Sequence, residues 1–185
     1  MTDIVFPHGA LILDACCLIN LLATAHVEAI IDSLPCAVFV ADYVLTDEVI
    51  KLEDEPFRSN AEGLQRRIDA GKVQIVDFES ATEQMRFIEL AGVFRLDDGE
   101  AKSAAIAVER DWAIASDDRK IHTVIPRIAP AIRLLTTPEL IKHWSDTCLV
   151  DPRVLVEAML SIERNARYRP ARHHSLGDWW HNSTG

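Results

Sequence analysis

Acidic residues stand at the ends of two apolar segments of the chain. Asp14 lies within the run ALILDACC at residues 10–17, and Asp117 and Asp118 follow directly after the run WAIAS at residues 112–116. An unpaired carboxylate in apolar surroundings costs several kcal/mol unless a partner compensates it, and a bound cation is one such partner. In an open parallel sheet, ligands bind outside the carboxyl ends of the strands, so these segments predict acids at one shared edge.

Two glutamates on expected helices extend this set. Glu48 lies in the segment DYVLTDEVIKL at residues 42–52, at the edge of an apolar helical stripe. Glu100 lies in the first turn of a helix expected at about residues 98–110, where the helix N-terminus favours a carboxylate. Carboxylates brought together repel one another, and divalent cations relieve that repulsion.

Oxygen ligands of this kind suit Mg²⁺ or Mn²⁺. Two such ions about 4 Å apart can activate water and stabilise the leaving oxygen of a phosphodiester. The paired aspartates after WAIAS therefore indicate one wall of a metal site that acts on phosphodiesters.

Short apolar runs alternate with segments of helical periodicity over most of the chain. This alternation predicts an α/β fold, a three-layer α/β/α sandwich with a mostly parallel central sheet. Asp97 or Asp98 is expected to cap the helix at residues 98–110, and Thr137 is expected to cap a later helix that begins with Pro138. The expected strands are residues 10–17, 36–41, 73–78, 112–116 and 131–135, with helices at 18–31, 42–52, 60–70, up to 90, 98–110, after 119 and 137–144.

The last part of the chain differs in composition. Residues 151–185 carry five arginines against four acidic residues, whereas the whole chain has a net charge of −10. One more amphipathic helix is expected from Asp151 to about residue 164, and the remaining stretch YRPARHHSLGDWWHNSTG has little periodicity. We therefore expect an α/β domain at residues 1–148 and, at residues 149–185, a helix with a flexible or partner-binding tail.

Composition limits the class of protein. The 29 acidic residues against 19 lysines and arginines exclude a general nucleic-acid coat, so any nucleic-acid site must be local. Four cysteines without a CxxC pair indicate reduced thiols and a cytoplasmic protein. The apolar stretch at residues 10–22 is interrupted by Asp14 and Asn20, which fits neither a signal peptide nor a membrane span.

The order of four motifs resembles a known family. LILDACCLINLL, YVLTDEVIKL, GEAKSAAIA and IASDDRK are similar to the motifs of PIN-domain nucleases, which include the VapC-like toxin ribonucleases of toxin–antitoxin pairs. The GEA form of the third motif is closer to a less characterised branch of PIN proteins. By position, Asp14, Glu48, Glu100 and Asp118 match the four acids of the family, and Asp117 is the adjacent acid that many members also show.

The resemblance implies a Mg²⁺- or Mn²⁺-dependent ribonuclease whose four matched acids are catalytic and bind metal, with Asp117 in support. It also implies an RNA substrate, a homodimer and, if the protein is a toxin, a small antitoxin. It covers roughly the first 145 residues and says nothing of the tail. Cys16 departs from the pattern because a small hydroxyl residue often follows the first aspartate at this distance.

Each acid also has an ordinary structural interpretation. Asp14 can cap the helix after it, Glu48 can lie on a solvated face, and Glu100 can complement a helix dipole. One of Asp117 and Asp118 can cap the helix that follows them.

Two other classes of function stay open. One is a noncatalytic binding module that uses the last helix and tail. The other is a receiver-like phosphoacceptor, although the late-strand lysine of that class is not evident near AIRLL. Arg119 and Lys120 can hold a substrate phosphate or form surface ion pairs, and Trp179 and Trp180 can stack on RNA bases or dock a protein partner. His173, His174 and His181 lack the spacing of a closed metal site.

Overall fold

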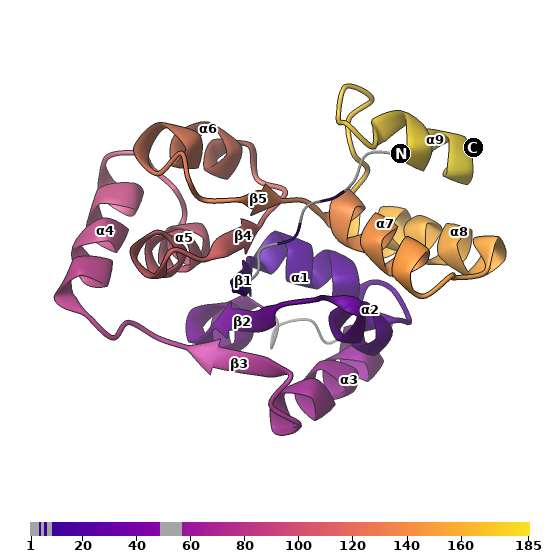
Figure 1. The fold of residues 1–185 in the computed structure, drawn as a ribbon, viewed down its shortest axis with the longest axis horizontal. Coiled ribbons are helices and arrows are strands. Elements are labelled where there is room, and N and C mark those ends of the chain that lie inside the picture. Colours follow the sequence, from indigo (N-terminus) through magenta and orange to yellow (C-terminus); the bar gives the residue numbers. More distant parts are fainter. Residues whose placement is uncertain (1–3, 5, 7–8, 49–56) are drawn as a thin grey trace.

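The computed structural model describes residues 4, 6, 9–48 and 57–185, with the backbone alone at residues 47 and 48. Its centre is a five-stranded sheet in the order β3-β2-β1-β4-β5, and all four strand pairings are parallel. Helices lie on both sides of this sheet, so the predicted three-layer α/β/α sandwich is confirmed (Figure 1). The strands are β1 Ala10–Leu13, β2 Ala37–Ala41, β3 Val73–Val76, β4 Ala113–Ala115 and β5 Leu134–Leu135.

Two groups of helices form the outer layers. Helix α5 contacts β1, β2 and β4, and α4 packs on α5; α1, α2, α3 and α7 contact one another on the other side (Figure 1). In chain order the helices are α1 Ala15–Leu22, α2 Val27–Ser33, the π-helical turn η1 Val44–Glu48, α3 Phe57–Asp69, α4 Ala81–Gly92, α5 Asp98–Arg110, α6 Arg119–Ile128, α7 Thr137–Thr147, α8 Pro152–Ser161, the π-helical turn η3 Ile162–Ala166 and α9 Gly177–Thr184. Among the helices that the structure describes, none has the length and apolar composition needed to cross a membrane.

The apolar composition of the central strand β1 reflects its burial on both faces. All four residues of β1 are buried, because a strand covered by helices on both faces needs apolar side chains at every position rather than at alternate ones. Helix α5 presents Ala101, Ala104 and Ala105, all fully buried, to the sheet. Small side chains on this face allow the helix backbone to approach the strands closely.

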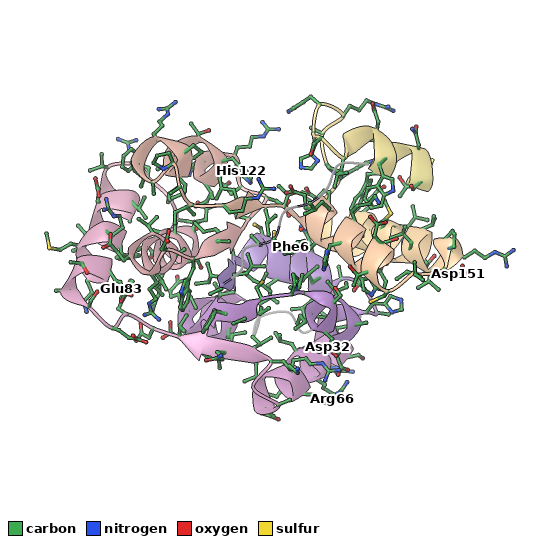
Figure 2. The ribbon with its side chains drawn as sticks, in the orientation of Figure 1. Phe6, Asp32, Arg66, Glu83, His122 and Asp151 are labelled. Atoms are coloured by element: carbon green, nitrogen blue, oxygen red, sulfur yellow. The ribbon has the colours of Figure 1, made fainter. Side chains whose placement is uncertain are left out.

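Charged contacts hold the outer helices in place. Glu83, labelled in Figure 2, is 3% exposed, and its Oε1 accepts a hydrogen bond from Arg110 Nε at 2.6 Å, which joins α4 to α5. Arg66 of α3 pairs with Glu28 of α2 at 2.6 Å. The second pair lies at the surface and contributes little; the buried Glu83 would be costly without its partner.

Register places the ends of β1 and β4 side by side. Leu13 pairs with Ala115, and the backbone N–H of Asp14 donates to the Ala115 carbonyl at 3.0 Å. From β1 the chain proceeds to β2 and β3 on one side, whereas β4 and β5 lie on the other. The strand order therefore reverses between β1 and β4, which is where open α/β sheets bind ligands.

Several expected boundaries were wrong by a few residues. The single helix expected at 18–31 is the two helices α1 and α2, and the strands expected at 73–78 and 131–135 are the shorter β3 and β5. The first strand ends at Leu13 rather than Cys17, because the Asp14 side chain accepts from the Ala15 N–H and caps α1. Helix α7 is capped by Thr136 instead of Thr137, since the Thr136 N–H donates to Glu139 Oε2 at 2.9 Å in a capping box.

The last 35 residues are folded onto the domain, which corrects the expectation of a flexible tail. The side chain of Trp180 on α9 is fully buried, and its Nε1 donates to Glu163 Oε1 at 2.8 Å. Trp180 belongs to the same hydrophobic core as Ile12 and Met159, so the segments predicted at 1–148 and 149–185 share one core. Helix α9 has only eight residues, too few for periodicity to reveal it.

Candidate metal centre

Asp14 is a buried carboxylate at the carboxyl end of β1. Its side chain is 1% exposed, and burial is the main cause that raises its pKa above the ordinary value. Oδ1 accepts from the Ala15 N–H at 2.9 Å, and Oδ2 accepts from Ser116 Oγ at 2.8 Å and Cys16 Sγ at 3.4 Å. A carboxylate has about four acceptor directions, so these three donors orient Asp14 and leave it one free direction.

Asp14 lies in a small acidic cavity between two helix N-termini. The cavity has a volume of about 170 Å³. Asp14, Cys16 and Ile19 line it from the start of α1, and Asp97 and Glu100 line it from the start of α5. The structure therefore brings the predicted residues Asp14 and Glu100 together.

Asp97 has two roles at the start of α5. It caps the helix as expected: its Oδ1 accepts from the Glu100 N–H at 3.0 Å, while Glu100 Oε2 accepts from the Asp97 N–H at 3.2 Å. The same carboxylate also lines the acidic cavity, which sequence reasoning missed. The signal was present in the sequence, because the pattern D-x-x-E places a capping aspartate one turn from the predicted metal ligand.

Glu100 is an acid of the cavity whose pKa is raised. Partial burial, followed by the nearby charges of Asp97, Asp118 and Asp14, raises its pKa to about 7. Asp118 is therefore close enough to act on Glu100 through space. Crowding of like charges without a cation produces a shift of this sign.

Asp118 caps α6 with one oxygen. Its Oδ1 accepts from the N–H groups of Lys120 at 2.6 Å and Ile121 at 3.2 Å. Its second oxygen receives no hydrogen bond from the residues that the structure describes. The capping interpretation and a metal-binding interpretation are therefore compatible for this residue.

Asp117 has a different environment from its neighbour. One oxygen accepts from the Thr137 N–H at 3.0 Å and from Tyr168 Oη at 2.8 Å, and the other accepts from Asn20 Nδ2 at 2.9 Å and from the Thr137 hydroxyl. Its oxygens are thus occupied by donors from α1, α7 and the segment after η3. Asp117 joins these elements, and the predicted supporting role in metal binding stays a prediction.

Glu48 is the last residue of η1, and its side chain lies outside what the structure describes. Its predicted place among the metal ligands therefore stays a prediction.

The donors in the acidic cavity fit a hard divalent cation. Asp14, Asp97 and Glu100 line the cavity, and Asp118 is close enough to raise the pKa of Glu100. All four offer carboxylate oxygens, the ligands that Mg²⁺ and Mn²⁺ prefer. Within the described parts of the chain, no lysine or arginine forms an ion pair with any of the four. Among the described residues, their negative charge therefore has no basic partner.

A second group of ligand atoms does not fit a metal as well. Cys16, Cys17 and Asp117 have ligand atoms within 4.8 Å of one another. Burial raises the pKa of the Cys17 thiol well above its ordinary value, and its Sγ donates to Asp117 Oδ2 at 3.4 Å. A protonated thiol is not a metal ligand, so this group is a hydrogen-bonded network.

The fold and site define an α/β/α sandwich with an acidic cavity at its switch point. Comparisons with protein-family models, with curated proteins and with solved structures found no match for the chain. The resemblance to PIN-domain nucleases therefore stays a prediction based on the four motifs.

Proposed function

We propose that the protein is a Mg²⁺- or Mn²⁺-dependent ribonuclease that hydrolyses phosphodiester bonds of RNA. The observation that supports this proposal most directly is the cavity at the β1–β4 switch point, where Asp14, Asp97 and Glu100 converge without a basic partner among the described residues. The motif resemblance supplies the substrate class. The acidic lining of the cavity supports the proposed divalent cation.

Each acid has a separate task in this proposal. Asp14, Glu100 and Asp118 hold the cation, Asp97 completes the acidic wall, and Glu48 is a further ligand by resemblance. The bound cation supplies activation of water and stabilisation of the negative charge that develops on the phosphodiester. Ser116 fixes the Asp14 carboxylate through a 2.8 Å hydrogen bond. This bond keeps Asp14 from reorienting when substrate enters.

The cation competes with a proton at Glu100. Because the pKa of Glu100 is about 7 without metal, many molecules carry a proton there at neutral pH. Cation binding must displace that proton, so affinity rises with pH.

Further proposals concern the protein's setting. The cysteine usage supports a cytoplasmic location. The resemblance implies a homodimer and, if the nuclease is a toxin, a small antitoxin that covers the acidic cavity. Purification with and without the neighbouring gene product tests the antitoxin, since a true antitoxin would abolish cleavage at equimolar ratio.

Replacing Asp14 tests the central proposal. Asp14→Asn should reduce cleavage of a mixed RNA pool in Mn²⁺ by more than about a hundredfold, because a neutral amide binds the cation far less well. The fold should be retained, since the new amide oxygen still accepts from the Ala15 N–H and the burial penalty on a charge disappears. Gel analysis of the RNA and a calorimetric Mn²⁺ titration are the measurements.

Asp69→Asn, an exposed substitution on α3, is the matched control and should cleave like the original chain. Cleavage by Asp14→Asn at the original rate would refute the metal nuclease. Absence of both cleavage and Mn²⁺ binding in the original chain would favour the noncatalytic module.

A further inference from the structure

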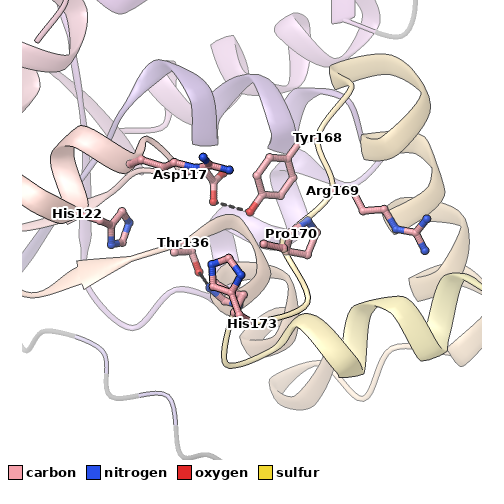
Figure 3. Close-up of a pocket in the computed structure, with 10 residues that line it drawn as sticks. Asp117, His122, Thr136, Tyr168, Arg169, Pro170 and His173 are labelled. Carbon is pink, nitrogen blue, oxygen red and sulfur yellow. Dashed lines mark hydrogen bonds between the residues drawn. The ribbon is translucent and has the colours of Figure 1, made fainter.

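A second cavity has Asp117 in its lining, one residue before Asp118. It has a volume of about 270 Å³ and lies between the ends of β4 and β5 and the segment after η3 (Figure 3). Its lining includes Asp117, Arg119, His122, Tyr168, Pro170 and His173. The segment after η3 contributes half of these residues, so the tail that the family resemblance leaves out builds this cavity.

Two cationic or titratable side chains of the lining are free to bind a ligand. Arg119 and His173 are exposed, and their side chains have no hydrogen bond or ion pair within the described part of the chain. Lys120, by contrast, donates from Nζ to the Arg95 carbonyl at 2.9 Å. Arg169 extends away from His122 in Figure 3 and pairs with Glu163 at 3.2 Å. Arg119 is thus the free guanidinium of this cavity.

The opposite wall is held in place by hydrogen bonds. Tyr168 is half-buried and donates its hydroxyl to Asp117 Oδ1, which Figure 3 marks with a dashed line. His174 accepts from the Leu176 N–H at 3.0 Å and lies 3.1 Å from Thr136 Oγ1. These contacts fix the loop that carries Pro170. A ring held in this way can receive a flat group at low entropic cost.

One hydrogen bond joins residues that line the two cavities. The backbone N–H of Asp117 donates to Cys16 Sγ at 3.1 Å, and Cys16 lines the acidic cavity. Asp118 follows Asp117 directly. A ligand that bridges the two cavities therefore stays on the same edge of the sheet.

We infer that the second cavity is a subsite for one nucleotide of a single-stranded RNA, next to the bond that is cut; this inference rests on the proposed function. Arg119 and His173 contact the phosphate, and the base or ribose lies against Tyr168 and Pro170. A cavity of about 270 Å³ lies just below the usual size of ligand sites, which suits one nucleotide better than a duplex. Recognition of unstacked bases on aromatic rings is typical of single-stranded RNA.

The charge of the chain supports a local subsite. A protein with a net charge of −10 repels RNA over most of its surface. A guanidinium without a protein partner at the edge of the cavity provides the attraction where it is needed. Asp117 adds little repulsion, because five donors from four residues share its charge.

Arg119→Gln tests the subsite, with Arg153→Gln as the matched control, because Arg153 is exposed on α8 and its side chain also has no partner among the described residues. The probe is a fluorescein-labelled single-stranded RNA of mixed sequence, followed by anisotropy in EDTA. Arg119→Gln should weaken binding about tenfold or more. It should also reduce the slope of log affinity against log salt by about 0.7, the loss of one phosphate contact on a single strand.

A second variant and a second ligand sharpen the result. His173→Gln alters another exposed side chain of the lining. This variant should also bind the single-stranded RNA more weakly than the original chain. An RNA duplex of the same length should bind less tightly than the single strand. Equal affinity of Arg119→Gln and Arg153→Gln, or no RNA binding by the original chain, would overturn the inference.

The outcomes separate this inference from the proposed function. Binding that depends on Arg119 without any cleavage in Mn²⁺ would retain the nucleotide subsite and remove the nuclease. Cleavage in Mn²⁺ with equal KM for Arg119→Gln and the original chain would retain the nuclease and remove the subsite.

Discussion

Two adjacent aspartates after β4 serve different purposes. Successive side chains of extended backbone point in opposite directions. Asp117 therefore accepts hydrogen bonds from α1, α7 and Tyr168, while Asp118 caps α6 and acts electrostatically on Glu100. The residue type is the same, and only the direction of the side chain decides which carboxylate is free for a ligand.

Glu100 should make the metal-free protein less stable as pH rises. Its folded pKa of about 7 lies above its ordinary value of 4.5, so the folded state holds the extra proton in this window. The unfolding free energy that Glu100 contributes is therefore complete below pH 4.5 and is lost as pH rises toward 7. Glu100→Gln should flatten this part of the stability profile, measured by thermal unfolding in EDTA from acidic to neutral pH.

Mn²⁺ provides the control for that measurement. At neutral pH a saturating cation should raise the melting temperature of the original chain by about 5 °C or more, and Glu100→Gln should lose most of that gain. Parallel pH profiles for the two proteins, together with an unchanged response to Mn²⁺, would show that Glu100 is outside the metal centre.

At the scale of elements, helix starts build the site. Both walls of the acidic cavity are first turns, of α1 and of α5, where backbone N–H groups point at the carboxylates and the helix dipole favours negative charge. A capping residue is already held at this place by the helix. Capping and the proposed metal binding therefore involve the same side chains at Asp97 and Asp118.

Two substitutions of Asp97 separate these shared roles. Asp97→Ala should cost about 1 kcal/mol, or about 2–4 °C in melting temperature, because the Glu100 N–H loses its acceptor. Asp97→Asn should keep the cap and most of this stability. Both variants should bind Mn²⁺ more weakly, since both remove a negative charge from the cavity.

Thermal unfolding measures the capping role in the two Asp97 variants, and Mn²⁺ calorimetry measures the metal-binding role. Full Mn²⁺ affinity in Asp97→Asn would mean that Asp97 only caps the helix.

At the scale of the whole molecule, the C-terminal segment belongs to the domain. Tyr168 bonds to Asp117, and Trp180 occupies the common core. The segment therefore contacts the edge of the sheet where the site lies. Removing it would expose apolar surface and also release one donor from Asp117.

Trp180→Ala should destabilise the entire protein. Truncating a fully buried tryptophan costs about 3–5 kcal/mol, which corresponds to about 10 °C in melting temperature for a chain of this size. Because there is one core, unfolding should remain a single transition whether it is followed by circular dichroism or by tryptophan fluorescence.

Trp179→Ala is the matched control, since Trp179 is only half-buried. A second, separate transition in Trp180→Ala, or no loss of stability, would indicate an independent tail as the sequence suggested.

The sequence by itself determined the class of fold and most of the strands and helices. Continuous apolar runs such as ALIL and AIA require burial on both faces, and alternation with helices then permits little besides a parallel sheet. It also selected Asp14 and Glu100, which line one cavity, as candidate ligands, because an acid in an apolar run and an acid in a first turn are local features.

Only the tertiary structure decided which acids converge and what the tail does. Asp97 lines the same cavity as Asp14, although the two residues are more than 80 positions apart in the chain. Asp117 does not line this cavity, and its oxygens accept hydrogen bonds from three distant segments. These outcomes depend on strand order, register and the direction of each side chain. Local periodicity carries no information about them, because contacts between distant segments form only when the core is packed.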